Sequence, residues 1–158
     1  MWYLLRNYLT LHLLISLASA PLSADVTLPN IFSDHMVFQR DQPIRVFGQA
    51  APGESITVTF AGESGSTEAA PNGYWRVQLP SVAADRSART LTIEGNNTVT
   101  FQDILVGDVW LCSGQSNMEW TLTNTANGNK EITAANYPEM RLFNVTGHTQ
   151  SRSPQKST

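Results

Sequence analysis

Residues Ile56-Thr-Val-Thr-Phe60 alternate between apolar and polar side chains at every step. A period of two is typical of a β-strand that buries one face and exposes the other to water. This is the clearest strand signal in the chain. We therefore predict a strand here and look for partner strands on either side of it.

Similar signals recur on both sides of this strand. Short apolar or alternating segments occur at 36–39, 44–47, 75–79, 91–93 and 99–101, with no comparable helical stripe between them. They are separated by stretches such as Asp41-Gln-Pro43, Ala51-Pro-Gly53, Pro71-Asn-Gly73 and Gly95-Asn-Asn97, whose residues favour turns. Strands broken by turns at this spacing predict an antiparallel β-sandwich over residues 25–103.

Trp75 and Tyr74 allow two interpretations of this domain. Aromatic faces on a β-sandwich can bind sugars, but alternating aromatic residues in strands usually fill the core. Trp75 shares its strand face with Val77 and Leu79, so we expect it to be buried.

Composition excludes some classes of function. The net charge is -3, and no basic stripe could neutralise a phosphate backbone, so we expect no nucleic-acid partner. The single cysteine, Cys112, excludes a disulfide within the chain, and its apolar neighbours predict a buried, inert thiol. With 41% apolar residues, 158 residues suffice for one domain and part of another.

Residues 1–24 have the features of a secretory signal peptide. Arg6 provides the positive charge, Leu9 to Ala18 is mostly apolar, and Leu22-Ser-Ala24 provides a small-residue cleavage site before Asp25. We therefore expect export, to a periplasmic or extracellular location, or to a lysosome or the exterior in a eukaryote. The alternative is an uncleaved anchor, but the apolar stretch is shorter than the ~20 residues that cross a bilayer, so we expect no stable membrane span.

The pattern changes at Ile104. Ile104-Leu-Val106 and Val109-Trp-Leu-Cys112 are nearly continuous apolar runs, as in a parallel strand that is covered on both faces. We predict that a second, α/β domain occupies residues 104–158, with a short helix over Glu131 to Asn136 and another strand over Met140 to Val145.

Small and polar residues, Ser113-Gly-Gln-Ser-Asn-Met118, follow this run. In open α/β sheets, ligands bind at the carboxyl ends of strands. Gly114 permits a sharp turn that would expose the Ser116 hydroxyl, and backbone N–H groups after the turn could donate to an oxyanion. The alternative is an ordinary polar loop, because Met118 stands where the second glycine of a Gly-x-Ser-x-Gly elbow would be.

The string DVWLCSGQSNMEW at 108–120 closely resembles the first conserved block of the sialate O-acetylesterase family, within the SGNH hydrolase group. Residues 28–60, GYWRVQLP and DILVGDVW also resemble this family. The resemblance implies an SGNH-type, flavodoxin-like three-layer α/β hydrolase domain after the β domain. It also implies that Ser116 is the nucleophile that attacks an acetyl ester on a sugar, that its N–H lies in the oxyanion hole, and that Gly114, Gln115 and Asn117 support the loop.

The partners of such a serine are missing. A serine nucleophile needs a base, usually a histidine held by a carboxylate. The family has them in an Asp-x-x-His block, but no aspartate follows Asp108 here. His148, the only later histidine, reads as a solvated loop residue, and His35 reads as a turn residue.

We therefore interpret the chain as an incomplete piece of a carbohydrate O-acetylesterase that acts on an O-acetylated sugar or polysaccharide, inactive by itself. A partial α/β domain cannot bury both faces of its sheet, so we expect a large exposed apolar surface. We expect neither a metal nor another cofactor. The alternative is a secreted β-sandwich that binds carbohydrate or mediates adhesion, with SGQSNM as an inactive remnant.

Overall fold

The computed structural model describes residues 24–114 and 116–145. The predicted signal peptide lies outside this part of the chain, except for Ala24. The described residues up to 107 are mostly β-structure, and those after it contain short helical turns and one helix. The strands are β1 (Val37–Gln39), β2 (Pro43–Gln49), β3 (Ser55–Phe60), β4 (Glu63–Glu68), β5 (Tyr74–Ser81), β6 (Asp85–Glu94) and β7 (Thr98–Gly107).

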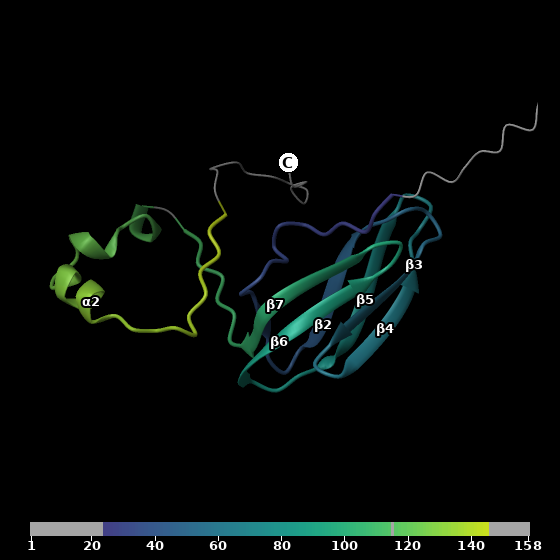
Figure 1. Ribbon diagram of the computed structural model, residues 1–158. Coiled ribbons are helices and arrows are strands. Elements are labelled where there is room, and N and C mark those ends of the chain that lie inside the picture. Colours follow the sequence, from purple (N-terminus) through teal and green to yellow (C-terminus); the bar gives the residue numbers. More distant parts are fainter. Residues whose placement is uncertain (1–23, 115, 146–158) are drawn as a thin grey trace, which may run out of the picture.

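The strands form two sheets (Figure 1). One sheet has five strands in the order β1-β7-β6-β3-β4, and the other pairs β2 with β5. All pairs are antiparallel except β1 with β7, which is parallel. The mostly β character that the alternating pattern predicted is confirmed, and each of the six strand segments predicted within residues 25–103 lies within or overlaps a strand.

A strand that sequence patterning missed is β4. Its residues, Glu63-Ser-Gly-Ser-Thr-Glu68, include no large apolar side chain, so they carry no hydrophobic period. The strand forms at the sheet edge because its backbone pairs with β3, and two hydroxyl pairs cross the ladder, Thr57 with Ser66 at 3.0 Å and Thr59 with Ser64 at 2.9 Å. Pairing by a neighbouring strand therefore decided its structure.

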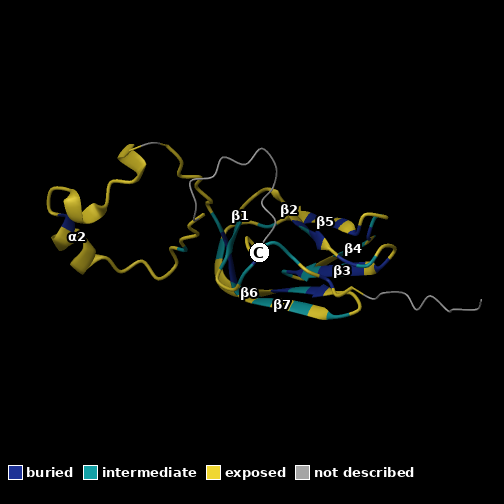
Figure 2. Ribbon diagram, turned by 90° about the horizontal axis from the view of Figure 1, so that it is seen from above, coloured by how far each residue is buried: buried dark blue, intermediate teal, exposed yellow. Residues whose placement is uncertain are grey.

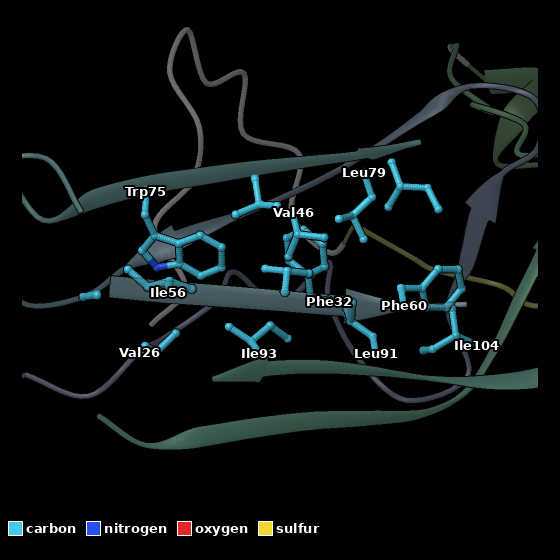
Figure 3. Packing of buried hydrophobic residues seen from close by; sticks show 14 of the residues in the cluster. Val26, Phe32, Val46, Ile56, Phe60, Trp75, Leu79, Leu91, Ile93 and Ile104 are labelled. Atoms are coloured by element: carbon cyan, nitrogen blue, oxygen red, sulfur yellow. The ribbon is translucent and has the colours of Figure 1, made fainter. Parts of the chain in front are cut away.

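A single core joins the two sheets (Figure 3). Ile56, Val58 and Phe60 are 0%, 0% and 1% exposed, as their alternation predicted. Trp75 is 1% exposed, which confirms it as a core residue rather than a sugar platform, whereas its neighbour Tyr74 is 41% exposed. Burial of such side chains contributes about 1.5–3 kcal/mol each and is the main stabilising term of this fold.

The apolar run that begins at Ile104 forms the end of β7. Ile104, Leu105 and Val106 are all buried, as predicted, and the backbone there pairs with β1 in parallel and with β6 antiparallel. The expectation that this run begins a separate sheet is wrong, because these residues complete the five-stranded sheet. Strand β7 crosses from Thr98 to Gly107 without a break at position 103.

The next apolar run does not form the predicted buried strand. Val109 to Cys112 is in no strand, and Trp110 and Leu111 are 84% and 94% exposed. Cys112 is exposed, so the expected buried thiol is also wrong. Met140 to Val145 forms no strand either. Apolar runs become buried strands only beside strands that pair with them, and the described residues offer none here.

The chain after β7 folds into short helical pieces. These are η1 (Ser116–Met118), η2 (Leu122–Asn124) and α2 (Gly128–Ala134). The predicted helix exists, but it begins three residues earlier than expected and ends before Tyr137-Pro138. Gly128 is buried because α2 approaches η2 so closely that a Cβ there would overlap the Leu122 carbonyl. Nearly all other residues of this part are exposed (Figure 2).

A search for membrane-spanning helices within the described residues finds none that is long and apolar enough.

Candidate functional site

Ser116 begins the helical turn η1 and is exposed to solvent. The turn is closed by a hydrogen bond in which the Glu119 N–H donates to the Ser116 carbonyl oxygen at 3.2 Å. Gly114, two residues before Ser116, packs closely against the Met118 side chain, since a Cβ at Gly114 would lie 2.6 Å from Met118 Cγ. Asn117 is exposed inside the turn, and Gln115 lies outside the described residues.

Helical turn η1 places the exposed Ser116 at its N-terminal end. The first N–H groups of a helical turn have no partner within the turn. In enzymes, backbone N–H groups of this kind can stabilise a developing oxyanion. Within the described residues, the Ser116 hydroxyl forms no hydrogen bond and has no histidine or carboxylate partner, so nothing there would take its proton. The predicted buried strand before the serine is absent, and the loop follows an extended, exposed segment instead.

The segment that leads to Ser116 leaves the sheet at a defined point. The Arg40 N–H donates to the Gly107 carbonyl at 2.9 Å, and the Val109 N–H donates to Gln39 Oε1 at 2.8 Å. Arg40 Nε also donates to Asp108 Oδ1 at 2.8 Å, and this hydrogen bond raises the pKa of the Arg40 guanidinium. The end of β1 therefore orients the first residues of the segment.

Within the described part of the chain, no histidine lies beside Ser116. His12 and His148 lie outside the described residues, and His35 occupies a turn, as predicted. Its Nδ1 lies 2.6 Å from Asp103 Oδ2, a pairing that the sequence could not reveal because 68 residues separate the two. The pair belongs to the β-sheet part of the chain, whereas the helical turns lie apart from β7 (Figure 1).

Two hollows lie on the surface of the β-sheet part. A shallow hollow on the β-sheet part is lined by the His35 turn and by β6 and β7, and another by residues of β1 and β2, and neither is lined by Ser116. The part of the chain that the structure describes holds no group of three or more residues able to bind a metal ion.

Known proteins similar to this chain are carbohydrate esterases. No protein-family model matches the chain. The sialate O-acetylesterase of Mus musculus is 30% identical over 150 residues, which cover 85% of this chain and 27% of that protein. The enzyme of Homo sapiens is 31% identical over 126 residues, which cover 72% of this chain and 24% of that protein. The chain thus spans about a quarter of the length of these relatives.

A solved structure with a similar fold is also a carbohydrate esterase. The crystal structure of a carbohydrate acetylesterase from Xanthomonas citri matches the fold with a TM-score of 0.68 at 40% sequence identity, over 72% of this chain and 26% of that one. Because the similarity in sequence extends over most of the residues and the fold agrees, this chain belongs to the sialate O-acetylesterase family.

Proposed function

We propose that this chain supplies the nucleophile of a carbohydrate O-acetylesterase. Ser116 Oγ attacks the acetyl carbonyl, its proton passes to a base, and the sugar hydroxyl leaves with a proton. Water then attacks the acetyl-enzyme and releases acetate. The observation that carries the proposal is Ser116 at the start of an exposed helical turn, two residues after Gly114, in a chain similar to sialate O-acetylesterases.

The proposed substrate is an O-acetylated sugar or polysaccharide. The names of the similar proteins support this class, since they are sialate O-acetylesterases and a carbohydrate acetylesterase. The net charge of -3 and the lack of a basic stripe argue against a nucleic-acid substrate. The positively charged and apolar start of the sequence supports export, with cleavage before Asp25.

We further propose that the base comes from polypeptide beyond these 158 residues. No aspartate follows Asp108, and the described residues place no histidine beside Ser116. The relatives are about four times as long as the matched region, which leaves ample sequence for an Asp-x-x-His block.

Exposed apolar side chains support an incomplete second domain. Monomeric proteins rarely expose many large apolar side chains together, and such a surface marks an interface that is normally covered. Between 108 and 145 the exposed large apolar residues include Val109, Trp110, Leu111, Trp120, Leu122, Tyr137, Met140, Leu142 and Phe143. We propose a β-sandwich up to Gly107, followed by the start of an SGNH-type α/β domain whose remaining strands cover this surface.

Hydrolysis of p-nitrophenyl acetate tests the proposal in two steps. The 158-residue chain should hydrolyse the ester no faster than its Ser116→Ala variant, because a serine without a base is a poor nucleophile. A clear Ser116-dependent rate would show that a base is present within the chain.

The second step uses the longer protein, if the reading frame continues past Thr158. Its Ser116→Ala variant should lose at least about 10³-fold in activity, as removal of a nucleophile does in serine hydrolases. Ser113→Ala is the matched control, three residues earlier in the same segment, and should retain activity. A reading frame that ends at Thr158, or an active Ser116→Ala enzyme, would favour the secreted carbohydrate-binding or adhesion module instead.

A further inference from the structure

Arg141 differs from the residues around it in burial. Among the described residues from 108 to 145, all are exposed except Gly128 and Arg141. Gly128 is covered within this part of the chain by the Leu122 backbone. The Arg141 side chain is only 27% exposed, whereas its neighbours Met140 and Leu142 are 62% and 90% exposed. Arg141 is therefore the point at which this part of the chain is covered by the β-sheet part.

The contact between Arg141 and the β-sheet part is an ion pair with Asp103. Arg141 Nη2 donates to Asp103 Oδ2 at 2.7 Å, and Nη1 donates to the Pro138 carbonyl at 2.8 Å. The first bond joins β7 to the segment after α2, and the second holds that segment in a turn around the guanidinium. Glu139 also contacts Arg86 at 3.3 Å, but the Arg86 side chain is 86% exposed, and such pairs contribute little.

The backbone conformation at Asp103 directs its side chain toward Arg141. It has a left-handed backbone, φ 55°, where the pairing of β6 with β7 shifts register, and His35 opposite has φ 64°. The His35 turn and strand β7 are joined by two hydrogen bonds, from the His35 N–H to the Gln102 carbonyl oxygen at 3.0 Å and from the Gln102 N–H to Asp34 Oδ1 at 2.7 Å. A β-bulge of this kind redirects a side chain out of the strand's regular alternation.

His35 fixes the orientation of the carboxylate. An ionised carboxylate only accepts hydrogen bonds, so His35 Nδ1 carries the proton and donates to Asp103 Oδ2 at 2.6 Å. This hydrogen bond lowers the pKa of Asp103, against a smaller opposing effect of desolvation, and the charge of Arg141 lowers it further. The carboxylate therefore stays charged at neutral pH, as an arginine partner requires.

We propose that Asp103, oriented by His35, is a docking point that holds the segment around Arg141 against the β-sheet part. The chain from 108 to 141, which carries Ser116, is then attached at both ends, at the exit from β7 by Gln39 and Arg40 and at the return by Asp103. Attachment at two points restricts the orientations that this part can take. The inference does not depend on esterase activity.

Limited digestion of the 158-residue chain with chymotrypsin tests the docking point. A protease binds several residues on each side of the cleaved bond in an extended conformation, so the contact of Arg141, two residues before the exposed Phe143, should slow cleavage after Phe143. Arg141→Gln and Asp103→Asn should therefore each speed this cleavage about two- to fivefold, the effect of losing one partly covered ion pair. Cleavage after Trp110 serves as an internal reference and should not change. The matched control is Arg86→Gln, which removes the exposed pair with Glu139.

A double variant separates docking from general damage. If Asp103 and Arg141 act on each other, then Asp103→Asn with Arg141→Gln should be cleaved no faster than either single variant. The proposal is overturned if Arg141→Gln is cleaved at the wild-type rate, if Arg86→Gln has an equal effect, or if the two single effects multiply. Arg141→Gln alone suffices if Asp103→Asn does not fold, because Arg141 lies outside the core.

Discussion

Replacement of Gly48 by alanine should destabilise the β-sheet part, although intrinsic preference predicts the opposite. Gly48 is a buried residue of β2 without a left-handed backbone. Alanine usually stabilises such a position by about 0.4–1 kcal/mol, since it restricts the unfolded chain. Here, however, a Cβ would overlap the Thr27 carbonyl oxygen and would lie 2.9 Å from Trp75 Cζ2. Neither the backbone nor a core indole can move aside cheaply.

The magnitude follows from what the added methyl group displaces. Thr27 and Gln49 exchange two backbone hydrogen bonds of 2.8 and 2.9 Å, each with a net contribution of about 1 kcal/mol. The residue before Thr27, Val26, is 2% exposed, and its burial contributes about 1.5–3 kcal/mol. If the segment moves out, most of this stabilisation is lost. After the gain from alanine is subtracted, we expect a loss of about 3 kcal/mol.

Thermal and urea unfolding at neutral pH would measure this loss. For a domain of this size, about 3 kcal/mol corresponds to a fall in Tm of about 10–20 °C. The control is Gly107→Ala, at the end of β7, where the nearest atom to an added Cβ is Val37 Cγ1 at an ordinary 3.7 Å. That variant should change stability by less than about 1 kcal/mol. The reasoning is refuted if Gly48→Ala unfolds at or above the wild-type temperature.

Two further predictions concern polar contacts. Asp103 should titrate below the ordinary carboxyl range in ¹³C NMR, so its stabilising charge is present above that range and lost as the pH falls through its lowered pKa. His35→Ala should raise this pKa more than Arg141→Gln does, and the reverse order would contradict the assignment of His35 as the main cause. Asn97 accepts from the Val26 N–H at 2.6 Å and donates to its carbonyl at 3.2 Å, so Asn97→Ala should lower the free energy of unfolding by about 2 kcal/mol, measured by urea titration. An unchanged urea midpoint would show that Val26 is held by packing alone.

Much of the β-structure could be predicted from the order of residues. In strands such as β3 and β5, the alternation of apolar and polar side chains states which face is buried, because the pleat turns successive side chains to opposite faces. The polar strand β4 could not be predicted in this way, because its structure depends on pairing with β3. The apolar run at Ile104 predicts a buried strand correctly, but it does not indicate which strands pair with it. The expectation of a separate sheet is therefore wrong, since this strand pairs with β1 and β6.

Some features of the candidate site could also be predicted from the sequence, and others could not. The motif around Ser116 could be recognised from sequence, because it is contiguous and resembles a family block. The solvent exposure of Cys112 and Trp110 could not, since burial depends on neighbours that the described residues do not provide. Nor could the contact of His35 with Asp103, which joins a turn to strand β7 across 68 residues of sequence.

The sequence by itself determined the alternating strands, the turns between them and the serine motif, all of which depend on residues close together in the chain. Only the tertiary structure decided that β7 pairs with β1 and β6 and that Arg141 returns to Asp103. The physical reason is that strand pairing and ion pairing depend on which groups meet in space, and many registers satisfy the same local pattern.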